Sequence, residues 1–243
     1  NNTYAEAVVL AQTISNNFDK HWTDSVDVLV CPPSIDLKPV NTVFEFDHQP
    51  IQIGAQNVYW EPKGAFTGEV SVPMLKDVHC TCSIVGHSER RGYFGETNED
   101  VNRKVRALLD GGLYAVACVG ESLSVRDEGG AEEFVCAQVR AAFAGLEPEE
   151  AGKCVVAYEP IWAIGTGRTA TPEQAQDMCA AIRTTLADMF GAETANEMRI
   201  LYGGSMNVGN VEQLLAQPDI DGGLVGVASL KADQFVQLVK ACL

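Results

Sequence analysis

The chain has 243 residues, of which 46% are hydrophobic and 21% charged, as in an ordinary globular protein of one large or two small domains. Its formal net charge of −16 disfavours nucleic acid and anionic membrane surfaces as partners. There is no apolar run long enough to span a membrane, no signal-peptide pattern at the start, and no disulfide framework among the eight cysteines, so we expect a cytoplasmic location.

The chain opens with a helix signal, because Thr3 and Glu6 can form a capping box ahead of apolar residues at helical spacing. Short apolar, β-branched runs then alternate with helical patterns. Strands are predicted at residues 26–31, 51–55, 82–85, 114–119, 154–158, 199–202 and 223–225. Helices are predicted at residues 34–46, 99–110, 131–143, 172–190, 208–215 and 232–243.

This alternation predicts an α/β fold built on a parallel sheet. Because no linker, low-complexity tract or charge block interrupts it, residues 1–243 are expected to form a single domain. Seven strands after a first helix are one strand short of a closed (β/α)8 barrel, and the missing strand would precede the first helix. The working face of such barrels lies at the C-terminal ends of the strands.

Two titratable side chains stand where predicted strands end. Glu159 directly follows the strand at 154–158, and His87 lies two residues after the strand at 82–85. Since these strand ends share one face of a barrel, the two side chains are expected to form a general acid–base pair. The alternatives are a surface salt bridge for Glu159 and a structural role for His87.

Glycine-rich loops follow three of the strands. The loop after Glu159 contains Gly165 and a bulky apolar tip, which indicates a lid. Gly203 and Gly204 follow the strand at 199–202, and residues 222–229 surround the last strand. Glycines there let backbone N–H groups approach an anion, which indicates a phosphate site, although tight turns are the alternative. There is no Walker-type sequence, so a nucleoside triphosphate is not expected.

A metal site is not expected. His79, Cys80 and Cys82 are close in sequence, and the two cysteines fall on one face of a strand. The chain contains no second ligand pair that would complete a tetrahedral centre.

Four motifs together carry a resemblance. They are Gly-Ala-Phe-Thr-Gly-Glu at 64–69, Val-Gly-His-Ser-Glu-Arg-Arg at 85–91, Ala-Tyr-Glu-Pro-Ile-Trp-Ala-Ile-Gly-Thr-Gly at 157–167 and Tyr-Gly-Gly-Ser at 202–205. In this order the chain resembles the triosephosphate isomerase family over essentially its whole length. The resemblance implies a TIM barrel, a place in glycolysis and gluconeogenesis, and a cofactor-independent interconversion of dihydroxyacetone phosphate and D-glyceraldehyde 3-phosphate.

The resemblance also implies residue roles. Glu159 would move the proton between neighbouring carbons through an enediolate, and His87 would polarise the carbonyl. Ser88 would touch Glu159 in the open site, and Cys118 would pack against it. Arg90 and Glu96 would form a structural ion pair behind His87. The phosphate would be held, largely through backbone N–H groups, by Gly165, Ser205, Gly226 and Val227. Residues 160–169 would form the lid.

The same resemblance implies a homodimer. Residues 63–69, from Lys63 to Glu69 with Thr67 at the tip, would insert into the partner subunit. The alternative is an ordinary exposed loop, although Phe66 argues against leaving it in water.

The chain departs from the family at two places. The first strand, which normally ends in Asn-x-Lys, is absent from these residues, and Val227 stands where the family often has a second glycine. Either the given chain omits an N-terminal segment, or it is a true truncation. A truncated chain would be an inactive barrel that only binds a phosphate ligand, because the missing lysine would be the one full positive charge facing the substrate.

A different phosphate-handling barrel is a further alternative. A sugar-phosphate isomerase of amino-acid biosynthesis remains open on the residues alone. A Schiff-base aldolase needs an interior strand lysine, and no predicted strand carries one.

Overall fold

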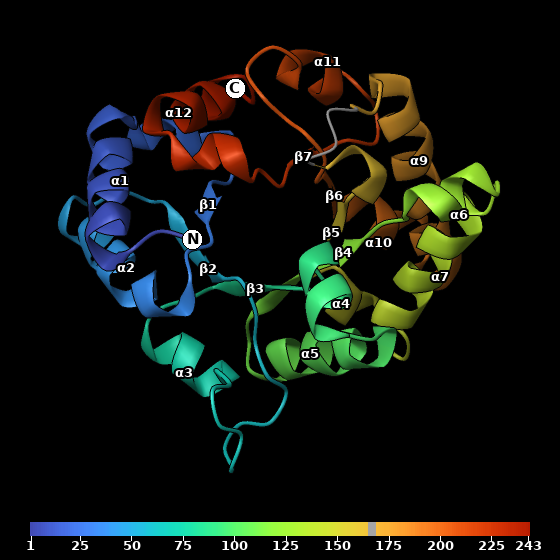
Figure 1. The fold of residues 1–243 in the computed structure, drawn as a ribbon, viewed down its shortest axis with the longest axis horizontal. Coiled ribbons are helices and arrows are strands. Elements are labelled where there is room, and N and C mark those ends of the chain that lie inside the picture. The colour runs from blue at the N-terminus through green and yellow to red at the C-terminus, as the bar shows by residue number, and fades with distance from the viewer. Residues whose placement is uncertain (165–168) are drawn as a thin grey trace.

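A computed structural model describes residues 1–164 and 169–243. In these residues seven parallel strands form one curled sheet, and helices surround it on the outside (Figure 1). The strands run in chain order, each paired with the next: β1 (Leu29–Val30), β2 (Gln52–Ala55), β3 (Cys82–Val85), β4 (Tyr114–Val119), β5 (Cys154–Tyr158), β6 (Arg199–Tyr202) and β7 (Gly222–Gly223). Within the described residues, β1 and β7 are the two edges of the sheet.

The helices lie between successive strands, except α1, which precedes β1, and α12, which follows β7. They are α1 (Tyr4–Asn17), α2 (Leu37–Phe46), α3 (Val72–Asp77), α4 (Ser88–Phe94), α5 (Asn98–Asp110), α6 (Leu123–Asp127), α7 (Ala131–Ala142), α8 (Pro148–Ala151), α9 (Pro172–Phe190), α10 (Ala192–Glu197), α11 (Val211–Leu215) and α12 (Ala232–Lys240). Four 3-10 turns complete the described chain: η1 (Lys20–Asp24), η2 (Ser34–Asp36), η3 (Ile161–Ala163) and η4 (Val227–Leu230). Helices α1 and α12 pack against each other, although they lie at opposite ends of the chain (Figure 1).

Alternation along the strands creates two apolar layers. In β4, Ala115 and Ala117 point outward to the helices, whereas Val116 and Cys118 point to the inner face of the curled sheet. The inner face also contains Ala157 of β5, together with residues from the other strands. Because the side chains alternate with a period of two, the residue after β5 continues its inward-facing row.

The central strands confirm the sequence prediction, since β3, β4, β5 and β6 have the predicted bounds. The strands predicted at 26–31 and 223–225 are shorter or shifted, as β1 and β7 each pair with one neighbour only. The capping box of Thr3 is also confirmed, because its backbone N and Oγ1 each donate to Glu6 Oε2 at 2.8 Å.

The helix predictions were less complete. The sequence pattern gives no bounds for five short helices, because four to seven residues are too few to display a helical period. They are α3, α4, α6, α8 and α10. The helix predicted at 208–215 begins only at Val211. The side chain of Asn207 accepts from Gly209 N at 2.8 Å, and this local hydrogen bond holds the preceding segment in a turn. No helix in the described part of the chain is both long and apolar enough to cross a membrane.

Candidate active site

Glu159 stands at the C-terminal end of β5 on the inward-facing row, and only 2% of it is exposed. Two glycines make room for it. A Cβ on Gly120 would overlap the carbonyl oxygen of Glu159, and a Cβ on Gly203 would lie 3.0 Å from Glu159 Cγ. The residues that follow β4 and β6 therefore need to be small for the carboxylate to occupy this position.

Three donors surround the Glu159 carboxylate. Ser88 donates its backbone N–H to Oε2 at 2.9 Å and its hydroxyl to Oε1 at 3.0 Å. His87 Nε2 lies 3.0 Å from Oε1. His87 is the N-cap of α4, and its Nδ1 accepts from the backbone N–H of Glu89 at 3.3 Å. A neutral imidazole with an accepting Nδ1 carries its proton on Nε2, so it can donate to the carboxylate.

The contacts of Glu159 and its burial have opposite effects on its pKa. Burial raises the pKa of Glu159, and the interactions with His87 and Ser88 offset only part of that rise. The Cys118 thiol is buried on the inner face of β4 and is hydrogen bonded to Glu159. Burial and the neighbouring carboxylate raise the pKa of Cys118, so this thiol stays protonated and is a poor nucleophile.

A second buried carboxylate holds the segment that carries His87. Glu96 accepts the backbone N–H of Gly86 at 2.8 Å on Oε1, and Arg90 Nε lies 2.7 Å from Oε2. Lys104 of α5, with a side chain only 5% exposed, lies 3.1 Å from the same oxygen. Burial raises the pKa of Glu96, but Lys104, Gly86 and Arg90 outweigh it, and the net shift is downward.

The start of the predicted lid is anchored in the protein interior. Trp162, in η3, donates its Nε1–H to Glu121 Oε1 at 2.7 Å, and Tyr158 donates its hydroxyl to the same oxygen at 3.1 Å. Arg126 lies 3.0 Å from this oxygen and stacks over the Trp162 ring at 4.6 Å. The rest of the predicted lid includes residues 165–168, so Gly165 lies outside the described residues.

The other predicted phosphate residues lie at the same end of the sheet. Ser205 follows β6, whereas Gly226 and Val227 follow β7, and all three are exposed. Gly204 lets the segment after β6 approach the lid, since a Cβ there would lie 2.8 Å from Pro160 Cγ.

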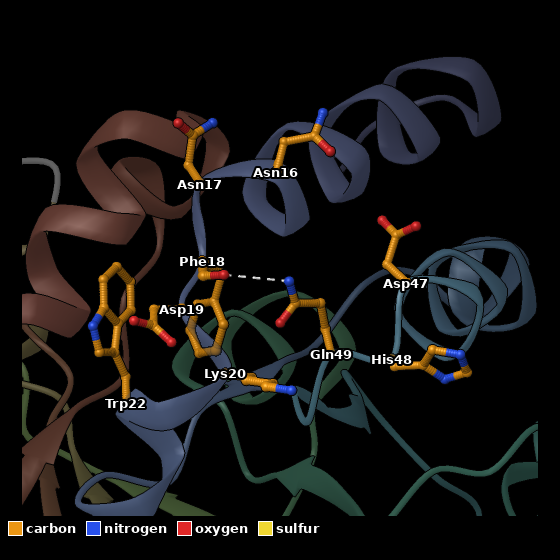
Figure 2. A pocket seen from close by; sticks show the side chains of 9 residues that line it. All are labelled: Asn16, Asn17, Phe18, Asp19, Lys20, Trp22, Asp47, His48 and Gln49. Atoms are coloured by element: carbon orange, nitrogen blue, oxygen red, sulfur yellow. Dashed lines mark hydrogen bonds between the residues drawn. The ribbon is translucent and has the colours of Figure 1, made fainter.

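Two other features lie away from this face. An open groove is lined by residues from segments 16–22 and 47–49, which precede β1 and β2 and hence lie at the opposite ends of the strands (Figure 2). None of the predicted site residues lines it. The described residues contain no cluster of three or more potential metal ligands, and His79 instead contacts Glu45, with 2.6 Å between Nδ1 and Oε1.

Three residues that shape the site were missed in the sequence. Lys104 falls on the apolar face of α5 with Val101, Val105 and Leu108, and a charged residue on such a face is a signal for a buried ion pair. Gly120 has no comparable signal, because the group that it must avoid lies 39 residues further along the chain. Arg91 lies within the motif at 85–91, but no sequence pattern indicates its contacts with the segments that end β3 and β4.

A buried carboxylate against an imidazole, at the carboxyl ends of parallel strands, is an arrangement typical of barrel enzymes that move protons. The profile of the family described as triosephosphate isomerase matches residues 1–242. A triosephosphate isomerase of Roseiflexus castenholzii is 55% identical over 212 residues, which cover 87% of this chain and 83% of the relative. One from Saccharopolyspora erythraea is 48% identical over 238 residues, covering 98% and 91%. One from Lactobacillus delbrueckii subsp. lactis is 48% identical over 214 residues, covering 88% and 84%. The chain belongs to the triosephosphate isomerase family.

The ion pairs of Glu96 with Arg90 and Lys104 lead to a stability prediction. We expect Glu96→Gln to lower the free energy of unfolding by about 3–5 kcal/mol, because it leaves the buried Lys104 ammonium without a counter-charge. The matched control is Glu99→Gln, which removes an exposed ion pair with Arg103 and should cost less than about 1 kcal/mol. Urea unfolding of the two variants and the wild type measures both values.

The difference in stability between the wild type and Glu96→Gln should also depend on pH. Because the folded pKa of Glu96 is lowered, its contribution is present above the pKa of an unfolded glutamate and is lost as pH falls through the folded value. The gap between wild type and Glu96→Gln should therefore shrink in acid. A gap that stays constant or widens would contradict this assignment.

Proposed function

We propose that Glu159 and His87 carry out the reaction of this family, the interconversion of dihydroxyacetone phosphate and D-glyceraldehyde 3-phosphate, which is a step of glycolysis. The observation that supports these roles best is the contact between a carboxylate that is 2% exposed and His87 Nε2, 3.0 Å away, at the catalytic end of the barrel. Family membership supports the reaction itself.

In this mechanism Glu159 removes the proton from the carbon next to the carbonyl, and an enediolate forms. The carboxylic acid then returns the proton to the neighbouring carbon. Burial strengthens Glu159 as a base, because it raises the pKa of the carboxyl group. His87 polarises the carbonyl with its Nε2–H, and a neutral ring suits a donor that must also take a proton back.

The remaining site residues hold the substrate and close the site. Backbone N–H groups at Ser205, Gly226 and Val227, together with Gly165, would bind the phosphate. Residues 160–169 would cover it and exclude water, which protects the enediolate from losing phosphate. The reaction requires no cofactor, because the carbonyl itself acidifies the abstracted proton.

The direct test is Glu159→Ala. We expect kcat/KM to fall by at least about a thousandfold, because the general base is lost while the substrate contacts remain. The matched control, Glu128→Ala, removes an exposed carboxylate after α6 and should leave activity unchanged. A coupled assay in both directions, with circular dichroism as a check of folding, measures this. An active Glu159→Ala protein would rule out the mechanism, and phosphate-ligand binding by an inactive wild type would support the alternative of a binding protein.

Ser88→Ala tests the electrostatics of the base. The hydroxyl of Ser88 stabilises the ionised form of Glu159, so its removal should raise the pKa of that carboxyl further. We therefore expect the acid limb of kcat/KM, which reports the free enzyme, to move to higher pH. Ser124→Ala on α6 should leave the limb in place. A shift to lower pH in Ser88→Ala would contradict the assignment of Glu159 as the titrating group.

We also propose a homodimer that uses residues 63–69, and a cytoplasmic location. Residues 61–69 are all exposed, and the loop projects away from the ring of helices (Figure 1). Phe66 packs on Tyr59 with ring centroids 4.7 Å apart, so the loop has a defined shape before any partner binds. Tyr93 and Phe94 of α4 are 81% and 70% exposed, which is unusual for aromatic side chains that face only water.

The proposed cytoplasmic location is supported by the cysteines. All eight cysteines are free, as expected in a reducing compartment.

Thr67→Arg tests the dimer. A bulky charge at the tip of an inserted loop should be buried without a counter-charge, so we expect the variant to be monomeric at micromolar concentration while the wild type has twice the chain mass. Sedimentation velocity distinguishes the two. Phe134→Ala, which truncates an exposed aromatic side chain on α7, is the control and should remain dimeric. A monomeric wild type would exclude the proposed dimer.

A further inference from the structure

Arg91, on α4, joins the ends of two strands that carry the active-site residues. Its Nε donates to the carbonyl of Gly86 at 2.7 Å, and its Nη2 donates to the carbonyl of Cys118 at 3.4 Å. The remaining arm, Nη1, donates to Asn98 Oδ1 at 2.7 Å. One planar guanidinium therefore spans the ends of β3 and β4 and the first residue of α5.

The backbone around Arg91 is shaped for this contact. Gly86 has a φ of +72°, and a Cβ there would lie 3.0 Å from Arg91 Nη2 and 3.0 Å from the Cys118 carbonyl oxygen. A side chain at position 86 would push the guanidinium away from both strands. Gly86 directly precedes His87, so the position of the guanidinium is linked to the position of the imidazole.

Arg91 also brings a positive charge behind the site. Burial lowers the pKa of Arg91, and the charges of Glu96, Cys118 and Glu159 act in the opposite direction. An arginine remains protonated under these conditions. The charged and titratable groups that face Glu159 itself are His87 and the Cys118 thiol. The positive charge of Arg91 favours the ionised form of Glu159.

We propose that Arg91 is a positioning residue for the isomerase reaction, an inference that rests on the function proposed above. Its guanidinium holds the Gly86 and Cys118 carbonyls so that His87 and Glu159 stay in contact, and its positive charge acts on Glu159 from behind the site. This role differs from that of the preceding arginine, since Arg90 pairs with Glu96 and stacks on Phe94.

The experiment compares Arg91→Met, Arg91→Lys and the control Arg140→Met, which changes an exposed arginine on α7. We expect Arg91→Met to lower kcat/KM on the order of ten- to hundredfold, as expected for lost hydrogen bonds to a charged group. The loss should appear mainly in kcat, because Arg91 does not touch the substrate. The acid limb of kcat/KM should move to higher pH. Arg91→Lys should restore the limb through its charge but not the full kcat, because an ammonium cannot span three acceptors.

Thermal unfolding is measured for each variant, since Arg91→Met leaves two carbonyls without a donor. If that variant does not fold, Asn98→Ala provides the test. It removes only the exposed third partner and leaves the charge of Arg91 in place, so we expect a smaller loss of kcat with the acid limb unchanged. An active wild type whose Arg91→Met variant keeps the wild-type pH profile and kcat overturns this inference alone, and so does an Asn98→Ala variant with the wild-type kcat where Arg91→Met does not fold. A wild type without turnover overturns the proposed function, and this inference with it.

Discussion

The structure depends on one unfavourable placement, a carboxylate that is almost entirely removed from water at the end of β5. Burying Glu159 costs free energy, and the cost is reduced by donors from two neighbouring strand ends. The backbone of Ser88 and its hydroxyl, the imidazole of His87 and the thiol of Cys118 all converge on it. The same burial raises the pKa of Glu159 and would make it a stronger base in the proposed mechanism, so the energetic cost and the proposed catalytic benefit have one physical origin.

In the proposed mechanism the Glu159 carboxylate can act only if the imidazole of His87 keeps its position beside it. The segment that carries His87 is held by Glu96, which accepts the Gly86 N–H, and by Arg91, which donates to the Gly86 carbonyl. Both backbone groups of one glycine are thus satisfied by charged side chains. Charge-assisted hydrogen bonds are stronger than neutral ones, so they define this turn more tightly than backbone pairing alone. Lys104 neutralises Glu96 from α5 and connects the site to the helical layer.

The sequence predicted the central sheet well for a physical reason. Strands β3 to β6 are buried on both faces and read as continuous apolar runs, so their bounds were correct. The predicted bounds of the edge strands β1 and β7 were less accurate. Each of these strands pairs with one described neighbour, and that neighbour alone determines where the hydrogen-bonded pairing ends. The short helices were missed because one or two turns leave no periodic signal. Among the site residues, Glu159, His87 and Ser88 were anticipated from strand ends and motifs, and the structure brings these three into contact.

The sequence by itself determined the order of strands and helices and the family, and it predicted that the candidate site residues lie at the carboxyl ends of the strands. Those properties follow from local patterns of polarity and from motifs within a few residues of each other. Only the tertiary structure decided which groups surround each charge. Gly120 makes room for a carbonyl 39 residues away, and Arg91 reaches a carbonyl 27 residues away. Such contacts depend on how the curled sheet brings strand ends together, and no pattern along the chain records that distance.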